Sequence, residues 1–304
     1  MVIDITYNTP NFIPIGVLIA IYFYITGLHA GFYTTSVVAT LIGIKEWKPI
    51  GKIGAAGAVV ILTIAPIFLL IDLGRPLRFW HLFVYLNPTS PITWGTFFLT
   101  TYPIIGLFYA WNVFRGNQKA AKIWGLVGFP IAISVHGYTG FILALGKARV
   151  LWNTSLNPIL FLVSAMVSGL ALIILVANIR LRYFTSRSTP AEREGDKGVI
   201  NTLMGYLIIF IIIDLFLIGC DLAVLATHTR DAHYTLLLLL AGPWAFWFLG
   251  VEIFLGEIIP LAMLSFRKIR MAAWGQNIAS VLIIIGIFVM RIIMVVGGQN
   301  VPLH

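Results

Sequence analysis

Eight long apolar runs limit the fold of this protein more than any other feature of its sequence. A helix needs roughly 20 apolar residues to cross the hydrocarbon core of a bilayer. The runs cover residues 13–44, 53–71, 93–114, 123–146, 156–179, 199–226, 234–264 and 272–296. The composition, 60% hydrophobic and 10% charged, is not that of a water-soluble protein. We therefore predict an all-α, polytopic membrane protein that forms a single integral membrane domain over residues 1–304.

The lysines and arginines are distributed unevenly between the two sets of connecting loops. Fourteen of the 20 lie in alternate loops, at 45–52, 115–122, 180–197 and 267–270. The opposite loops carry Arg75, Arg78, Lys147, Arg149 and Arg230. Short cytoplasmic loops are enriched in these cations, so the opposite loops and both termini are expected outside, in a multi-pass protein of the cytoplasmic membrane. Because this topology explains the net charge of +9, we infer no nucleic-acid partner.

Cysteine usage limits the cofactors that the protein can hold by itself. Cys220 is the only cysteine in the sequence, which excludes an internal disulfide and a cysteine-ligated cluster within the sequence. Any iron-sulfur chemistry therefore belongs to a partner, and no metal site is predicted here.

Five charged residues fall within the apolar runs, where each costs roughly 2.5 to 3.5 kcal/mol unless it is paired or hydrated. Asp214 and Asp221 are seven residues apart and share one helix face. Their depth matches that of Arg291, so an Asp–Arg pair is expected. Glu252 and Glu257 lie in the seventh run without an obvious cationic partner and can relay protons. The alternative is that these charges only hold helices together.

Two intramembrane histidines, His29 and His136, lie at similar depth and could ligate one haem. They cannot supply the four ligands that two b-type haems require. Small residues adjoin both histidines, which equally fits close packing at a helix interface.

A polar stretch, DLGRPLRFWHLFVYLNPTSPITWGTFFL, interrupts the apolar pattern at residues 72–99. Its prolines prevent a continuous helix, and its tryptophan and tyrosine residues favour the membrane interface. We predict a re-entrant loop or cap at the outer surface.

The residues of this stretch suit a planar ligand with carbonyl oxygens. Asp72 and Arg75 can pair, and Arg78 and His81 offer hydrogen-bond donors. The flat apolar walls would come from Trp80, Phe83 and Tyr85. A quinone head group fits this chemistry, whereas a purely structural cap that satisfies backbone groups is the alternative.

The same stretch resembles the signature of the polysulfide-reductase membrane-subunit family, also called NrfD-like proteins. An Asp-Leu-Gly-Arg-Pro turn is followed by Asn-Pro-Thr-Ser-Pro and by Trp-Gly at the start of a helix. Four further segments resemble this family in the same order: HGYTGFILA, ARVLWNTSLNPILFLVSAMVSG, GEIIPL and MRIIMVVGGQ. The resemblance covers nearly the whole sequence.

This resemblance implies a haem-free subunit of eight transmembrane helices, arranged as two four-helix bundles. Such a subunit exchanges electrons with menaquinone-like or other quinones near the outer surface, among the first four helices. It anchors an iron-sulfur subunit and usually a molybdopterin catalytic subunit on the outer (periplasmic or extracellular) face, in a complex that can dimerise. The complexes are of the polysulfide, sulfur or thiosulfate reductase type, and the membrane subunit does not act on the terminal substrate alone.

The resemblance also assigns roles to individual residues. Tyr138 occupies the Tyr-Thr-Gly position and is expected to hydrogen-bond a quinone carbonyl. Tyr22 stands five residues before Gly27, where some relatives have a histidine. The expected reaction site therefore comprises Tyr138, Asp72 and His29, and the expected binding residues also include Tyr22, Arg75, His81 and His136.

Two questions stay open at this level. Protons from quinol oxidation can leave outward, or protons can enter from the cytoplasm through Glu252, Glu257 or Asp214. Two other classes also suit the buried polar residues, namely a proton- or ion-translocating membrane subunit and a b-type cytochrome anchor.

Overall fold

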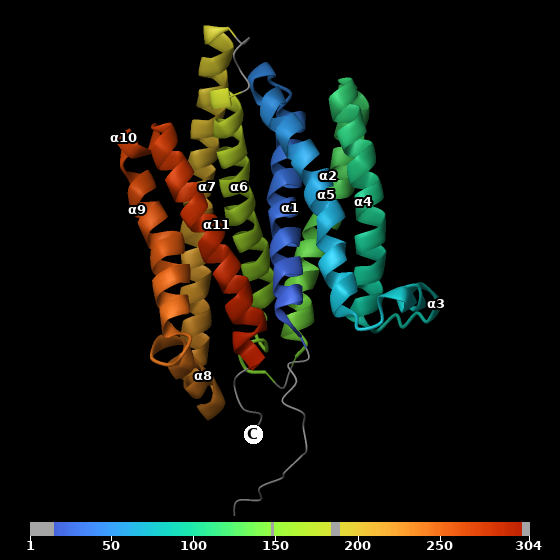
Figure 1. Ribbon diagram of the computed structural model, residues 1–304, viewed down its shortest axis with the longest axis vertical. Helices are drawn as coiled ribbons and strands as arrows, with labels where there is room; N and C mark the ends of the chain where they lie inside the picture. The colour runs from blue at the N-terminus through green and yellow to red at the C-terminus, as the bar shows by residue number, and fades with distance from the viewer. Residues whose placement is uncertain (1–14, 147–148, 184–188, 300–304) are drawn as a thin grey trace, which may run out of the picture.

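The computed structural model describes residues 15–146, 149–183 and 189–299 as an array of helices (Figure 1). Within these ranges there is no strand, and eight helices are long and apolar enough to cross a membrane. The prediction of an all-α polytopic membrane protein is therefore confirmed. The predicted outward location of the two termini concerns residues outside the described ranges.

Seven crossings are single α-helices, and the eighth is composite. The single helices are α1 (Val17–Ile42), α2 (Lys48–Asp72), α4 (Pro91–Arg115), α5 (Gln118–Ala144), α6 (Asn157–Tyr183), α7 (Pro190–Thr227) and α11 (Ala273–Val295). The composite crossing is the π-helix η3 (Phe246–Ile258), continued by α9 (Ile259–Ser265). The short elements are η1 (Lys45–Trp47), η2 (Pro76–Arg78), α3 (His81–Val84), α8 (Arg230–Leu240), α10 (Arg267–Arg270) and η4 (Gly297–Gln299).

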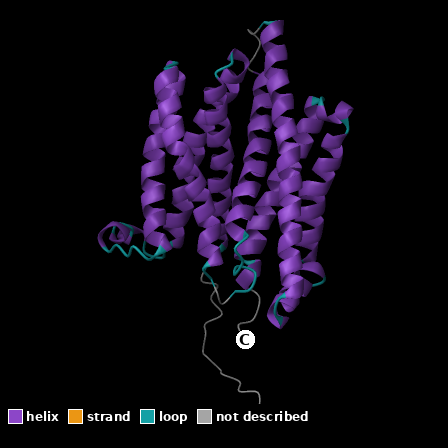
Figure 2. Ribbon diagram, turned by 180° about the vertical axis from the view of Figure 1, so that it is seen from behind, coloured by secondary structure: helices purple, strands orange, loops and turns teal. Residues whose placement is uncertain are grey.

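The helices sort by their contacts into two groups. α1, α2, α4 and α5 pack on one another and are called the first helix group. α6, α7, η3 with α9, and α11 form the second helix group. α1 joins the two, because it also packs on α6 and α11; it lies near the centre of the array in Figure 1, and Figure 2 shows the array from behind.

The contact between α1 and α6 depends on two glycines. Gly31 and Gly169 face each other so closely that a Cβ on either would clash with the backbone of the other. Gly256 of η3 and Gly286 of α11 make a similar approach, where a Cβ on Gly256 would lie 2.6 Å from the Cα of Gly286. Small residues allow such backbone approaches between membrane helices.

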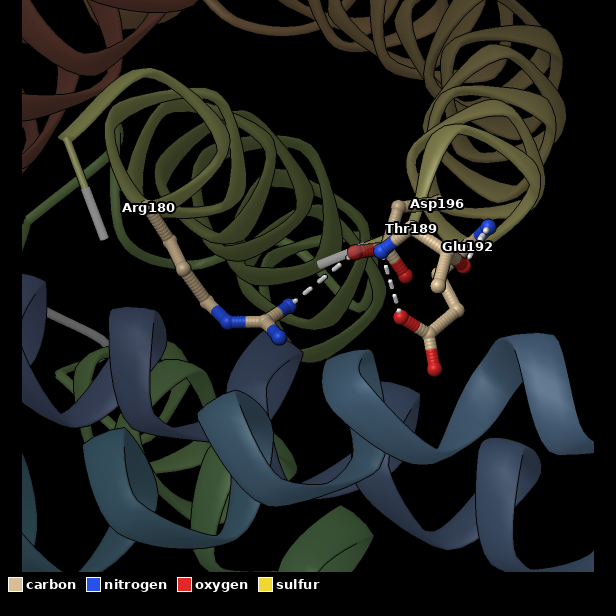
Figure 3. A network of polar contacts seen from close by, with 4 residues as sticks. All are labelled: Arg180, Thr189, Glu192 and Asp196. Atoms are coloured by element: carbon tan, nitrogen blue, oxygen red, sulfur yellow. Dashed lines mark hydrogen bonds and ion pairs between the residues drawn. The ribbon is translucent and has the colours of Figure 1, made fainter. Parts of the chain in front are cut away.

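The end of the array that carries most cations is held together by polar contacts at the start of α7 (Figure 3). Arg180 of α6 forms an ion pair with Asp196 of α7 at 3.3 Å. Thr189 and Glu192 form a capping box, in which each side chain accepts a hydrogen bond from the other residue's backbone N–H. We call this end, which also includes η1 and α10, the cation-rich end, and the other the opposite end.

The seventh predicted run, 234–264, is divided rather than continuous. α8 ends at Leu240, a turn follows, and η3 begins at Phe246. Pro243 lies in this turn; it lacks a backbone N–H and disfavours helical geometry at Gly242 before it. Apolarity alone did not reveal this break, because both halves are apolar.

We predict that Gly31→Ala destabilises the protein by about 1–3 kcal/mol, because the added methyl group forces α1 away from α6. Thermal unfolding of the purified protein in detergent measures this change. The matched control is Gly205→Ala in α7, where a Cβ would meet nothing within 4 Å. Equal stability of the two variants would contradict the proposed dependence on close backbone contact.

Candidate functional site

Two histidines and two tyrosines meet at the centre of the first helix group. His29 and Tyr33 come from α1, Tyr102 from α4 and His136 from α5. The His29 ring lies edge-on to Tyr102, with ring centroids 4.8 Å apart, and 6.1 Å from both Tyr33 and His136. We call these four residues the His–Tyr cluster. The two histidines, expected from the sequence to lie at similar depth, are thus also near each other in the structure.

Several polar atoms of this cluster have no hydrogen-bond partner among the residues that the structure describes. They are both ring nitrogens of His29, Nε2 of His136 and the hydroxyl of Tyr102, and all three side chains are buried. Buried polar groups are normally hydrogen-bonded, and leaving one unsatisfied costs free energy. The cluster is therefore able to bind a ligand or water molecules that supply the missing partners.

Tyr22 and Tyr138 lie nearer to the opposite end than the histidines do. Tyr22 follows the start of α1 by about 8 Å, and Tyr138 precedes the end of α5 by about 9 Å. The Tyr138 ring lies against Gly95 of α4, where any side chain would clash with it. Tyr22 is buried, and its hydroxyl lies near Thr26, one turn along α1, and interacts electrostatically with Tyr138. Tyr22 and Tyr138 therefore lie between the His–Tyr cluster and the opposite end.

The loop between α2 and α4 does not form the expected aromatic pocket. It projects to one side at the opposite end, where α3 packs mainly on α4 (Figure 1). Its aromatic side chains are exposed, Tyr85 by 74%, and His81 packs within the loop between Trp80 and Tyr85. The prolines of this loop prevent a long helix from forming. The loop therefore makes few packing contacts that could hold it over the array.

The pairing expected within this loop is also absent. Asp72 and Arg75 form no ion pair; Arg75 is exposed, and the Asp72 carboxyl group lies near Gly16 before α1. His29 lies about 18 Å along α1 from the start of that helix. The structure therefore does not bring Asp72, Arg75 or His81 to the His–Tyr cluster.

A series of polar residues that the sequence analysis missed continues from the cluster toward the cation-rich end. Tyr33 packs on Tyr109, whose hydroxyl lies 2.8 Å from both Ser36 Oγ and Thr40 Oγ1. Thr40 lines a cavity of about 160 Å³ at the cation-rich end.

The spacing of these residues is a signal that could have revealed them. His29 and Ser36, Tyr33 and Thr40, and Tyr102 and Tyr109 are each seven residues apart. That interval places both members of a pair on one face of a helix, two turns apart.

Arg291 occupies the junction between the two helix groups. Its guanidinium is 1% exposed and donates to the carbonyl oxygen of Phe161 at 3.0 Å and to Ser164 Oγ at 2.7 Å. It also lies over the Phe161 ring, 3.8 Å from the centroid. Gly27 of α1 lies beside it, since a Cβ there would be 3.8 Å from the guanidinium, an ordinary van der Waals distance.

The predicted Asp–Arg pair is wrong as a direct contact. Neither Asp214 nor Asp221 lies within ion-pair distance of Arg291, whose hydrogen bonds go to α6 instead. Asp214 and Glu252 interact with Arg291 electrostatically from further away. The position of a residue along its helix gives its depth in the membrane but not the direction in which its side chain points around the helix axis. The hydrogen-bond partners of Arg291 could therefore not be identified from the sequence.

Comparison with known proteins supports the family assignment. The family model described as polysulphide reductase, NrfD, matches residues 6–302. The chain belongs to the NrfD family. The resemblance noted in the loop and helix motifs is therefore confirmed across most of the sequence.

The relatives of this NrfD-family protein share moderate sequence identity with it. A selenate reductase subunit of Mesobacillus selenatarsenatis is 28% identical over 94% of this chain and 74% of the relative. The Hdr-like menaquinol oxidoreductase integral membrane subunit of Archaeoglobus fulgidus is 28% identical over 96% and 72%. A polysulfide reductase chain of Wolinella succinogenes is 30% identical over 58% and 61%.

We predict that Ser164→Ala destabilises this NrfD-family protein by about 1.5–3 kcal/mol, because it removes a hydrogen bond to a buried charged group. The matched control is Ser280→Ala, since the Ser280 hydroxyl is buried without a partner and its loss should be neutral or stabilising. Thermal unfolding compares the two. If Ser280→Ala cost as much, the hydrogen bond to Arg291 would not be the cause.

Proposed function

We propose that this protein is the quinone-interacting membrane subunit of a reductase complex, and that it passes electrons between membrane quinol and an iron-sulfur subunit. The observation that carries this proposal is the set of unpartnered hydrogen-bonding groups buried in the first helix group of an NrfD-family protein. The names of its relatives, among them a menaquinol oxidoreductase subunit and subunits of selenate and polysulfide reductases, support the same class of complex.

The polar groups suit the two carbonyl or hydroxyl oxygens of a quinone or quinol. Tyr22 and Tyr138 carry hydroxyl groups that can donate hydrogen bonds to one oxygen. Deeper in the membrane, Tyr102 can donate, and the unpartnered nitrogens of His29 and His136 can accept or donate. The aromatic rings around these atoms provide apolar contact for the ring of the ligand.

Oxidation of bound quinol supplies two electrons and two protons. Within the cluster, His29 can accept a proton or a hydrogen bond from bound quinol, because neither of its ring nitrogens has a partner among the described residues. From there, the rings of Tyr33 and Tyr109 lead to Ser36 and Thr40, and so toward the cation-rich end. Among these residues, hydrogen bonds join Tyr109 to Ser36 and Thr40, whereas the Tyr33 hydroxyl donates to the carbonyl oxygen of Trp124. Water molecules would therefore have to carry a proton from His29 to this group and on to the cavity beside Thr40.

The asymmetry of charge supports an orientation in the cytoplasmic membrane. The cation-rich end would face the cytoplasm, and the opposite end would face outward and receive the iron-sulfur subunit with its molybdopterin partner. The loop between α2 and α4 offers exposed apolar and basic groups for this contact, among them Leu77, 88% exposed, with Arg75 and Arg78. Asp72 and His81 would act from this loop rather than from within the membrane.

We predict that Tyr138→Phe and Tyr102→Phe each weaken binding of a quinol analogue about tenfold, because each removes one hydrogen bond worth about 1.4 kcal/mol. Fluorescence quenching of the purified protein measures this affinity. The matched control is Tyr206→Phe in α7, whose side chain is exposed on the lipid-facing surface.

Unchanged affinity in both site variants, with unchanged unfolding temperature, would contradict quinol binding in the first helix group. An absorption spectrum of the same sample separates the cytochrome alternative, because a haem ligated by His29 and His136 would give a Soret band that His136→Leu removes.

We also predict that Arg78→Glu, combined with Leu77→Asp, lowers recovery of the iron-sulfur subunit when the complex is purified through the membrane subunit. A reversed charge and a lost apolar contact both weaken an interface at this loop. Lys119→Glu at the cation-rich end is the control and should leave recovery unchanged. Equal loss in both variants would place the docking surface elsewhere.

A further inference from the structure

Two cavities in the second helix group meet at one side chain, that of Asp221. The larger has a volume of about 550 Å³ and lies at the opposite end, between the connection from α5 to α6, the end of α7 and the start of α8. Its lining is mixed: apolar side chains such as Val150 and Leu225 alternate with the polar residues Asn153, Thr154, Ser155, His228 and Thr229. Thr154 faces the carboxyl group of Asp221, which forms part of the wall.

The smaller cavity leads from Asp221 to Glu252. Its volume is about 30 Å³, which is sufficient for a water molecule. Asp221 and Glu252 are its only ionisable lining residues, and the remaining wall is apolar, for example Ile218, Phe248 and Met290. A water molecule in this cavity would therefore have carboxyl oxygens as its side-chain partners.

Glu252 begins a group of buried carboxyl groups deeper in the membrane. Glu252, Glu257 and Asp214 are 3%, 0% and 0% exposed. Within the described part of the chain, both carboxyl oxygens of Glu257 and of Asp214, and Oε2 of Glu252, have no hydrogen-bond partner. These carboxyl groups interact with one another, and the cation that faces them is Arg291 of α11.

Three elements place charged side chains around Glu252. α7 contributes Asp214 and Asp221, η3 contributes Glu257, and α11 contributes Arg291. The membrane-spanning part of α6 contains no ionisable residue. One buried guanidinium balances one carboxylate, so three carboxylates beside it would carry a net negative charge at high cost. At least part of this set is therefore held as neutral acid.

The backbone also supports a specialised role for this segment. Glu252 and Glu257 both lie in the π-helix η3, which spans Phe246–Ile258. Departures from α-helical winding are uncommon and occur frequently at functional sites. Here, the wider winding places two glutamates, five residues apart, next to α7 and α11.

We propose that the second helix group contains a half-channel that opens at the opposite end, and that it exchanges protons between the aqueous phase and Glu252 through Asp221. A hydronium ion in the larger cavity gives its proton to the Asp221 carboxylate and becomes water. Asp221 then passes a proton through a water molecule in the smaller cavity to the Glu252 carboxylate, and the reverse steps return it. No electron moves, and each transfer leaves one neutral and one ionised carboxyl group.

This half-channel is distinct from the proposed quinone site. Its residues lie on α7, η3 and α11, whereas Tyr22, Tyr138 and the His–Tyr cluster lie on α1, α4 and α5. The measurements below use the purified protein in lipid discs or vesicles without quinol or partner subunits. Their outcome therefore does not depend on the proposed electron transfer.

The first test measures access to Asp221 with a charged, membrane-impermeant thiol reagent. The native thiol is removed by Cys220→Ser, and Asp221→Cys is compared with Asp214→Cys, two turns away on the same helix. We expect Asp221→Cys to react at least tenfold faster than Asp214→Cys when reagent is added at the opposite end. Equal rates, or reaction only from the cation-rich end, would overturn the proposal.

The second test measures proton exchange at Glu252 by infrared spectroscopy. The carbonyl band of its protonated carboxyl group, assigned by its loss in Glu252→Gln, should shift after transfer to D₂O. We expect Asp221→Asn to slow this shift at least tenfold. Asp231→Asn, which alters a carboxyl group at the same end that lines neither cavity, should not slow it.

The second measurement remains decisive if the cysteine variants misfold, because Asp221→Asn keeps the shape of the native side chain. No assignable Glu252 band, or equal exchange rates in Asp221→Asn and wild type, would refute a proton route through Asp221.

Discussion

The buried guanidinium of Arg291 imposes a requirement that the rest of the structure meets. A charge at this depth is costly unless it is hydrogen-bonded and balanced. α6 supplies a backbone carbonyl, the Ser164 hydroxyl and the face of Phe161. Satisfying one cation thus ties α11 to α6, and both helices pack on α1 at the boundary between the two helix groups. The close contact of Gly31 with Gly169 belongs to the same boundary.

The same guanidinium links two polar systems that otherwise lie on different helices. It interacts electrostatically with Asp214 and Glu252 in the second helix group and with His136 in the first. The guanidinium attracts a carboxylate and repels an imidazolium. Low dielectric strengthens both effects compared with water. The charge state of one group therefore influences that of the other without any direct hydrogen bond between them.

The sequence was sufficient to predict the crossings, the uneven charge and the family, because apolar length and motif spacing are local properties. It was also sufficient to select Asp214, Glu252 and Arg291, since a charge in an apolar run is conspicuous. It could not predict that Arg291 bonds to Phe161 and Ser164, because a backbone carbonyl and one serine carry no signal in an apolar helix. The break at Gly242–Pro243 carries a local signal that a search for apolar length alone misses, whereas the lateral course of the loop containing Arg75 depends on tertiary contacts.

The contrast between Tyr109 and Tyr102 shows how the fold separates structural polar groups from available ones. Tyr109 has its hydroxyl beside Ser36 and Thr40, so its hydrogen-bonding capacity is used in joining α1 to α4. Tyr102, two turns closer to the histidines on the same helix face, is equally buried but has no partner. An unsatisfied hydroxyl costs free energy, and a fold that supplies two partners to one tyrosine and none to the next has kept the second available. The same reasoning applies to Asp214 and Glu257, whose oxygens are unpartnered while Asp196, near the cation-rich end, is paired with Arg180. Available polar atoms thus concentrate at membrane depth, where only a ligand, water or a proton can satisfy them.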